Sequence, residues 1–335
     1  MSEKKVSKDT DSKAVTGILR IRGLFVKSHN VSPIITLIGI VIVFLYANVI
    51  MRGNSNALLI YVPYLVWILL AESWNVAGGY AGLLNLGLVA FFGLGSVITG
   101  LSMVAGIPYS EALVLSGFSG ALLAVAMIPT FRLKSDYFAI ATLVLPFIIK
   151  PLAELIGRSS DYSTPAKYIL SPLAYFNLGM FLVAATIFGI FFLIRSRVGI
   201  ALRAVGDNEV ASASLGVNVM LYKTAALVAS GFIGAFAGGY FLQHFSFSTI
   251  SFEDLTYSLF PIFMVIVGGI GTFEGPIIGA LIFSWISITL NTYFPGTAYA
   301  YLLFSIVIIV IAVLLPKGIV PSAIRALKKI TKRYS

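Results

Sequence analysis

Most of this 335-residue chain consists of long apolar runs, each about long enough to span a membrane. An α-helix needs about 20 apolar residues to cross the hydrocarbon of a bilayer. Hydrophobic residues make up 59% of the sequence, charged residues only 11%, and the mean hydropathy is +0.98. Soluble globular domains carry about 25% charged residues. The sequence therefore predicts an all-α polytopic membrane protein.

Ten such runs follow one another between residues 33 and 315. They are Pro33–Met51, Leu58–Ala77, Leu83–Val104, Glu111–Pro129, Tyr137–Gly157, Leu173–Ile194, Thr224–Gln243, Leu255–Gly269, Pro276–Phe294 and Tyr299–Leu315. We expect about ten transmembrane helices, preceded by a polar tail at 1–32 and followed by a basic tail at 316–335. The polar leader is too long for an ordinary secretory signal, so the first span is expected to remain uncleaved.

The distribution of basic residues predicts how these spans are oriented. Lysine and arginine gather in the loops of membrane proteins that stay in the cytoplasm. With both termini inside, most of the 23 lysine and arginine residues fall in the inner segments 1–32, 130–136, 195–223 and 316–335. Orientation and attraction to anionic membrane lipid therefore explain the net charge of +10, and we expect no nucleic-acid partner. We expect a multi-pass protein of the cell membrane with cytoplasmic termini.

Several kinds of chemistry are excluded by what the sequence lacks. There is no cysteine, and the only two histidines, His29 and His244, lie far apart, so no metal site is expected. The sequence has no G-x-x-x-x-G-K-[ST] phosphate loop, no H-E-x-x-H and no G-x-S-x-G. We predict neither an enzyme nor a cofactor. If ATP drives this protein, another chain must bind it.

The longest water-compatible stretch inside the apolar region is residues 195–223. Its centre predicts a short helix, because Asp207 or Asn208 can serve as the N-cap and Glu209 then lies in the first turn. Gly216 can adopt the left-handed conformation that ends a helix. Two interpretations remain, a solvated connector or a docking helix for a cytosolic partner.

A second unusual stretch, residues 73–110, contains no charged residue and is rich in glycine between positions 78 and 95. Small residues allow helices to pack closely, but they also permit broken helices that face a transport pathway. The candidate pathway residues are Asn75, Gly78, Gly79, Gly82, Asn85 and Gly87. A related pattern, VGGIGTFEGPIIG, occurs at 267–279, so an internal repeat is a further hypothesis.

Few charges fall within the predicted spans. Glu72, Lys150 and Glu154 are scattered and make a poor proton relay, which argues against a stand-alone secondary transporter or channel. For Glu72, an interaction at the helix end is the favoured interpretation, and a place in the solute pathway is the alternative.

Taken together, several stretches resemble the permease subunits of branched-chain amino acid ABC importers, of the LivM type. They are SWNVAGGYAGLLNLGLVAFFGLG at 73–95, RLKSDYFAIATL at 132–143, RSRVGIALRAVGDNEVASASLGVNVMLYK at 195–223 and GGIGTFEGPIIGA at 268–280. The resemblance covers about residues 55–320, and the stretch at 195–223 is its most specific part. It implies a permease fold that assembles with a second homologous permease, two cytosolic ATP-binding subunits and an external solute-binding protein.

The resemblance also implies a role for the polar loop. Such importers carry a Glu-x-Ala…Gly coupling element that seats on the ATPase, and Glu209, Ala211 and Gly216 match it. Asp207 and Asn208 precede the match and complete the predicted ATPase-coupling site. Val210 departs from the commoner Glu-Ala-Ala pattern, which puts the details of the fit in question.

The implied function is a permease for branched-chain or other hydrophobic amino acids, coupled to separate ATPase subunits. A permease for urea or short amides is the alternative within the same class, because such permeases share the fold and the glycine-rich pattern.

Overall fold

The computed structural model describes residues 57–133, 135–156, 166–245, 255–295, 298–315 and 318–323, together with a few residues between 39 and 49 and Arg325. Within this part of the chain the regular secondary structure is entirely helical. The longer helices are α3 (Val62–Trp74), α4 (Leu88–Val104), α5 (Tyr109–Ala126), α6 (Ser135–Ile156), α7 (Pro172–Arg195), α10 (Val219–Phe245), α11 (Thr256–Gly268), α12 (Gly275–Tyr293) and α13 (Ala298–Leu314). The shorter elements are the π-helix η2 (Asn75–Tyr80), the 3-10 helices η3 (Ile128–Arg132) and η5 (Ala166–Tyr168), α8 (Arg197–Asp207) and α9 (Glu209–Ser214).

The all-helical prediction is confirmed, whereas the number of spans stays a prediction. Among the described residues, five helical stretches are long and apolar enough to cross a membrane. They are Ala57–Tyr80, Tyr109–Arg132, Asp136–Ala153, Pro172–Arg195 and Val219–His244. Three shorter apolar helices occupy 88–104, 256–268 and 275–290. Most of the predicted first span, 33–51, and of the two tails lies outside the described residues, so ten spans and cytoplasmic termini stay untested.

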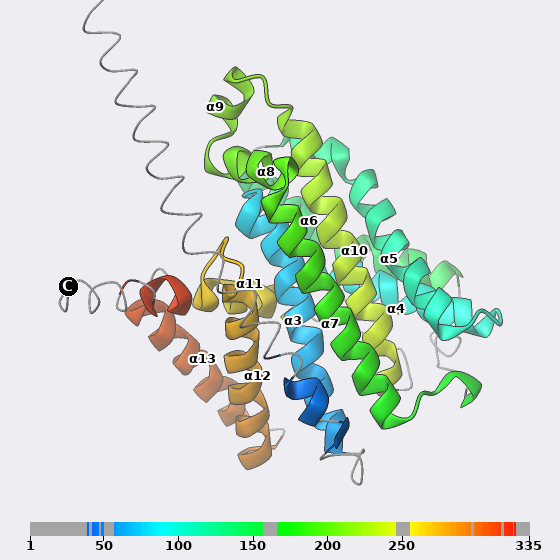
Figure 1. The fold of residues 1–335 in the computed structure, drawn as a ribbon. Helices are drawn as coiled ribbons and strands as arrows, with labels where there is room; N and C mark the ends of the chain where they lie inside the picture. Colours follow the sequence, from blue (N-terminus) through cyan, green and yellow to red (C-terminus); the bar gives the residue numbers. More distant parts are fainter. Residues whose placement is uncertain are drawn as a thin grey trace, which may run out of the picture.

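Helix α10 forms the centre of the main bundle and packs against α3, α4 and α5 (Figure 1). Glycines make this close packing possible. A Cβ atom at Gly95 would collide with the carbonyl of Ala235, and one at Gly238 would collide with the carbonyl of Phe92. Part of the glycine content therefore serves contact between helices.

The C-terminal helices form a second group, in which α12 packs against α3, α11 and α13. Aromatic rings join this group to the main bundle. The ring of Tyr257 on α11 stacks on Trp67 of α3 at 5.3 Å and on Phe92 of α4 at 4.8 Å between centroids. Stacked aromatic pairs add about 0.5–1.5 kcal/mol beyond burial of their area.

The outward faces of the bundle are strongly apolar. On α5, Phe118 is 62% exposed and Leu122 is 71% exposed, and Ile140 and Phe147 of α6 are also exposed. A contiguous apolar exterior is unfavourable in water and is expected where helices contact lipid. The exterior thus agrees with the membrane assignment made from composition.

Candidate coupling site

The polar stretch 195–223 folds into two short helices, α8 and α9, at one end of the helix bundle (Figure 1). Ser196 separates α7 from α8, and its side chain accepts a hydrogen bond from the Gly199 N–H at 3.3 Å. This N-cap lets the chain end one helix and start another within a single residue. A second change of direction at Asn208 starts α9.

Both ends of α9 have the predicted caps. Asn208 Oδ1 accepts a hydrogen bond from the Ala211 N–H at 3.0 Å, so Asn208 is the N-cap and Asp207 is the last residue of α8. At the other end Gly216 has φ +82°, and its N–H donates to the carbonyl of Ala213 at 2.9 Å. The Val217 N–H donates to the carbonyl of Ser212 at 3.1 Å. These two bonds form a Schellman motif, which satisfies carbonyls that the helix end leaves free.

Contacts with its neighbours hold α9 in place. Ser212 Oγ donates to the carbonyl of Ala204 on α8 at 2.7 Å. Glu209 forms an ion pair with Lys223 near the start of α10. Lys223 thus balances part of the Glu209 charge, although the Glu209 side chain stays 52% exposed.

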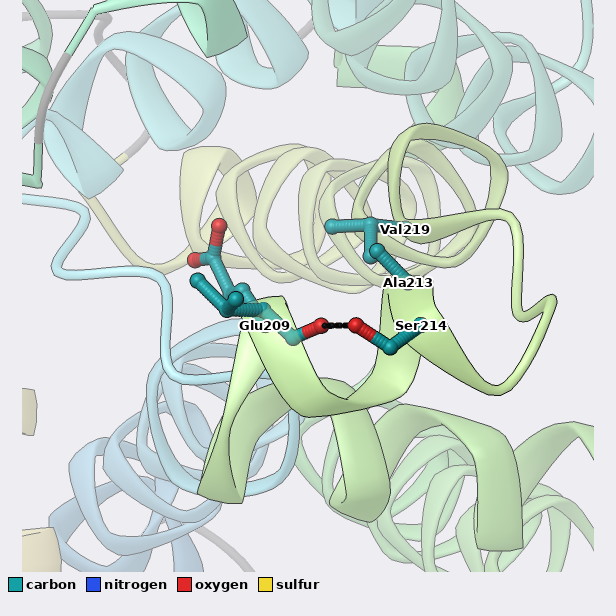
Figure 2. A pocket seen from close by; sticks show the side chains of 5 residues that line it. Glu209, Ala213, Ser214 and Val219 are labelled. Carbon is teal, nitrogen blue, oxygen red and sulfur yellow. Dashed lines mark hydrogen bonds between the residues drawn. The ribbon is translucent and has the colours of Figure 1, made fainter.

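The outer surface of α9 is apolar and open. Val210 is 78% exposed and Leu215 is 84% exposed, the latter the highest value among the large hydrophobic residues in the described part of the chain. Beside them lies an open hollow of about 590 Å³, lined by Glu209, Val210, Ala213, Ser214 and Val219 (Figure 2). Ser214 Oγ donates to the carbonyl of Val210 at 2.9 Å (Figure 2). Large apolar side chains exposed beyond the apolar bundle are typical of an interaction surface.

On its inner side α8 rests on η2. A Cβ atom added to Gly206 would lie 2.6 Å from the carbonyl oxygen of Tyr80, so only glycine permits this approach. The guanidinium carbon of Arg203 lies 5.3 Å from the centre of the Tyr80 ring. This distance is within the range of a cation–π interaction.

The π-helix η2 is in turn hydrogen-bonded to the second glycine-rich stretch, residues 267–279. Asn75 Nδ2 donates to the carbonyl of Thr272 at 3.0 Å, and Asn75 Oδ1 accepts from the Gly271 N–H at 3.0 Å. Tyr80 OH also donates to the carbonyl of Thr272 at 3.1 Å. We call these three hydrogen bonds the Asn75 clamp. The two glycine-rich stretches that suggested a repeat thus contact each other, and the repeat itself stays a hypothesis.

The remaining predicted pathway residues pack around this broken helix. After Tyr80 the chain leaves the helix until Leu88, with Gly82 at φ +69°. Asn85 Oδ1 accepts from the Gly87 N–H at 2.9 Å, and a Cβ atom at Gly87 would collide with the carbonyl of Thr142. Gly78 lies beneath the ring of Trp74. The helix is interrupted as predicted, and its glycines are tightly packed, whereas the placement of these residues along a transport pathway stays a prediction.

Several residues of this region were not singled out from the sequence. Thr272 and Gly271 form backbone hydrogen bonds with the Asn75 side chain, Arg203 contacts Tyr80, and Lys223 forms an ion pair with Glu209. Each acts on a residue distant in sequence, so no local pattern marks it. Among the described residues, no group of three or more histidine, aspartate or glutamate side chains is arranged to hold a metal ion.

Sequence comparison identifies the group of proteins to which this arrangement belongs. The model of a family described as the permease component of the branched-chain amino acid transport system matches residues 56–312. The chain belongs to this permease family. It is therefore a transport protein and not an enzyme, and its apolar helices place it in the plasma membrane as a multi-pass protein.

Individual relatives agree with this assignment. The permease is 24% identical over 313 residues to a probable branched-chain amino acid transport permease protein LivM of Methanocaldococcus jannaschii, covering 76% of this chain and 90% of the relative. It is 26% identical over 319 residues to the high-affinity LivM permease of Salmonella typhimurium, covering 84% and 73%. A shorter match, 35% over 77 residues, covers 22% of this chain and 24% of a nucleoside ABC transporter permease protein NupC of Lactococcus lactis. No solved structure matches the chain.

Proposed function

We propose that this permease forms half of the membrane channel of an ATP-driven importer for branched-chain amino acids. The observation that carries the proposal is the capped helix α9, which presents Val210 and Leu215 at one end of the bundle. An ATP-binding subunit would cover this surface. Family membership and the LivM relatives support the choice of solute.

The complete importer would contain two cytosolic ATP-binding subunits, a second homologous permease and an external solute-binding protein. Loop 195–223 would face the cytoplasm, since the distribution of basic residues favours that side. The absence of a phosphate loop from this chain agrees with ATP binding elsewhere.

Contacts between the helices support a path by which movement of an ATPase would reach the membrane helices. Helix α9 is tied to α8 through Ser212, and α8 rests on η2 through Gly206. The Asn75 clamp then joins η2 to the turn between α11 and α12. A pull on α9 would therefore shift α3, α11 and α12 together and change access to the solute path. The broken helix that begins at Asn75 would border that path.

The proposal predicts ATP-dependent uptake of leucine. The permease, co-expressed with the subunits encoded beside it, is reconstituted in proteoliposomes, and uptake of radiolabelled leucine and urea is measured with ATP or ADP inside. We expect leucine uptake with ATP and the loaded binding protein, and only background urea uptake. Urea uptake without leucine uptake would favour the amide-importer alternative. Equal leucine uptake with ATP and ADP would favour a secondary transporter.

A further inference from the structure

An apolar groove of about 840 Å³ lies between α3, α7 and α12. Its walls are aliphatic and aromatic side chains, including Leu65 and Ile68 of α3, Met180 and Val183 of α7, and Leu281 of α12. Three tyrosines, Tyr46, Tyr61 and Tyr64, line the same groove. Ligand sites of 300–1,000 Å³ with mainly apolar walls and few polar groups are typical of small-molecule binding.

One acidic side chain belongs to the wall of this groove. Glu274 occupies the N-cap position of α12, and its Oε1 atom is buried without a hydrogen-bond partner among the described residues. Burial raises the pKa of the Glu274 carboxyl above its ordinary value, because the charged form is poorly solvated there. A cation beside it would stabilise the carboxylate.

A second buried carboxyl group lies on the same face of α3 as the groove lining. Leu65, Ile68 and Glu72 are spaced by three and four residues, which places them on one side of a helix. Glu72 is fully buried, and neither of its carboxyl oxygens has a hydrogen-bond partner in the described part of the chain. The favoured helix-end interaction of Glu72 is therefore not seen in the described structure. Among the described residues, neither Glu72 nor Glu274 forms an ion pair with a basic side chain.

We infer that this groove binds the transported solute, with the branched aliphatic side chain against α3, α7 and α12 and the α-ammonium group beside Glu274. The inference rests on the proposed function and names a solute site that differs from the glycine-rich stretch. A buried carboxylate needs a paired cation, and an amphipathic ammonium compound supplies both the charge and the apolar surface. Urea lacks both the charge and an aliphatic part, and short amides lack the charge.

Two substitutions test the two halves of this site in the reconstituted importer. Glu274→Gln removes the carboxylate without a large change of shape, and Leu281→Trp fills the groove from α12. Their matched controls are Glu111→Gln, at the exposed first turn of α5, and Leu122→Trp, on the exposed face of α5. Co-purification of the ATP-binding subunits first verifies that each variant assembles.

We expect Glu274→Gln to lower leucine uptake about tenfold or more, since removing one member of a buried charge pair is costly. ATP hydrolysis stimulated by the loaded binding protein should stay close to that of Glu111→Gln. Leu281→Trp should lower leucine uptake more than valine uptake, because the shorter side chain needs less of the groove. Both solutes are measured with the same binding protein, so a change in their ratio arises in the permease.

Wild-type uptake separates the inference from the function on which it rests. If the wild-type importer takes up leucine with ATP while Glu274→Gln and Leu281→Trp match their controls, the groove is not the solute site. Equal loss of leucine and valine uptake together with lost ATP hydrolysis would instead indicate a packing surface for the second permease, and would also overturn the inference. An inactive wild-type importer would overturn the proposed function itself.

Discussion

Replacing Gly216 with valine will remove most ATP-driven leucine uptake while the permease still inserts and assembles in the membrane. Gly216 has φ +82°, and this left-handed conformation costs about 1–2 kcal/mol for a residue with a Cβ atom, more if that residue is β-branched. A Cβ atom there meets no other atom within 4 Å, so the effect is confined to the backbone. The Schellman bonds would break, and α9 would no longer present Val210 and Leu215 in one orientation.

The chain offers a matched control for this substitution. Gly106 has φ +93° and equally open surroundings, but it lies in the turn between α4 and α5. Gly106→Val introduces the same backbone strain away from the loop, and we expect it to retain uptake. Glu209→Lys, which places two positive charges together at Lys223, should reproduce the defect of Gly216→Val. Undiminished uptake by Gly216→Val and Glu209→Lys would make the loop a connector only.

Replacing Gly79 with alanine will break the Asn75 clamp and lower both the stability and the uptake of the permease. A Cβ atom at Gly79 would collide with Asn75 Oδ1 and lie 2.8 Å from the Gly271 nitrogen. The Gly271 N–H would then lose its acceptor, and an unsatisfied buried donor costs about 1–3 kcal/mol. Asn75→Ala removes the two hydrogen bonds made by the Asn75 side chain without the collision and should have the smaller effect.

The measurement is the temperature at which half of the detergent-solubilised permease is lost from its monodisperse chromatographic peak. Gly189→Ala is the control, because a Cβ atom at Gly189 on α7 meets nothing within 4 Å. We expect Gly79→Ala to melt well below both wild type and Gly189→Ala. If Gly79→Ala and Gly189→Ala melt together, the clamp does not hold η2 against the α11–α12 turn.

Local features of the coupling loop could be predicted from the sequence because their causes are local. An asparagine cap, an acid in the first turn and a glycine stop act within a few residues of α9, and the structure has all three. Capping preference could not decide between Asp207 and Asn208 as the cap, because aspartate and asparagine are equally good N-cap residues. That choice depends on where α8 ends, which in turn depends on its packing against η2.

The partners of Asn75 could not be predicted in the same way. Asn75 and Thr272 are 197 residues apart, and nothing near either residue indicates the other. Glycine content likewise indicates that another segment of the chain packs closely against the glycines, but it does not identify that segment. The sequence thus predicts the interruption of the helix at η2. The contacts of η2 with Gly271 and Gly206 are seen only in the three-dimensional structure.

The absence of cysteine permits a direct measurement of the central claim, that α9 receives an ATP-binding subunit. A single cysteine at Leu215, which is 84% exposed, is labelled with a photoreactive crosslinker in the assembled importer. Leu155→Cys, at an equally apolar and 82% exposed position near the end of α6, serves as the control. We predict that Leu215→Cys, and not Leu155→Cys, crosslinks to the subunit that carries the phosphate-binding loop. Equal crosslinking from both positions, or none from Leu215→Cys in an importer that hydrolyses ATP, would contradict the account.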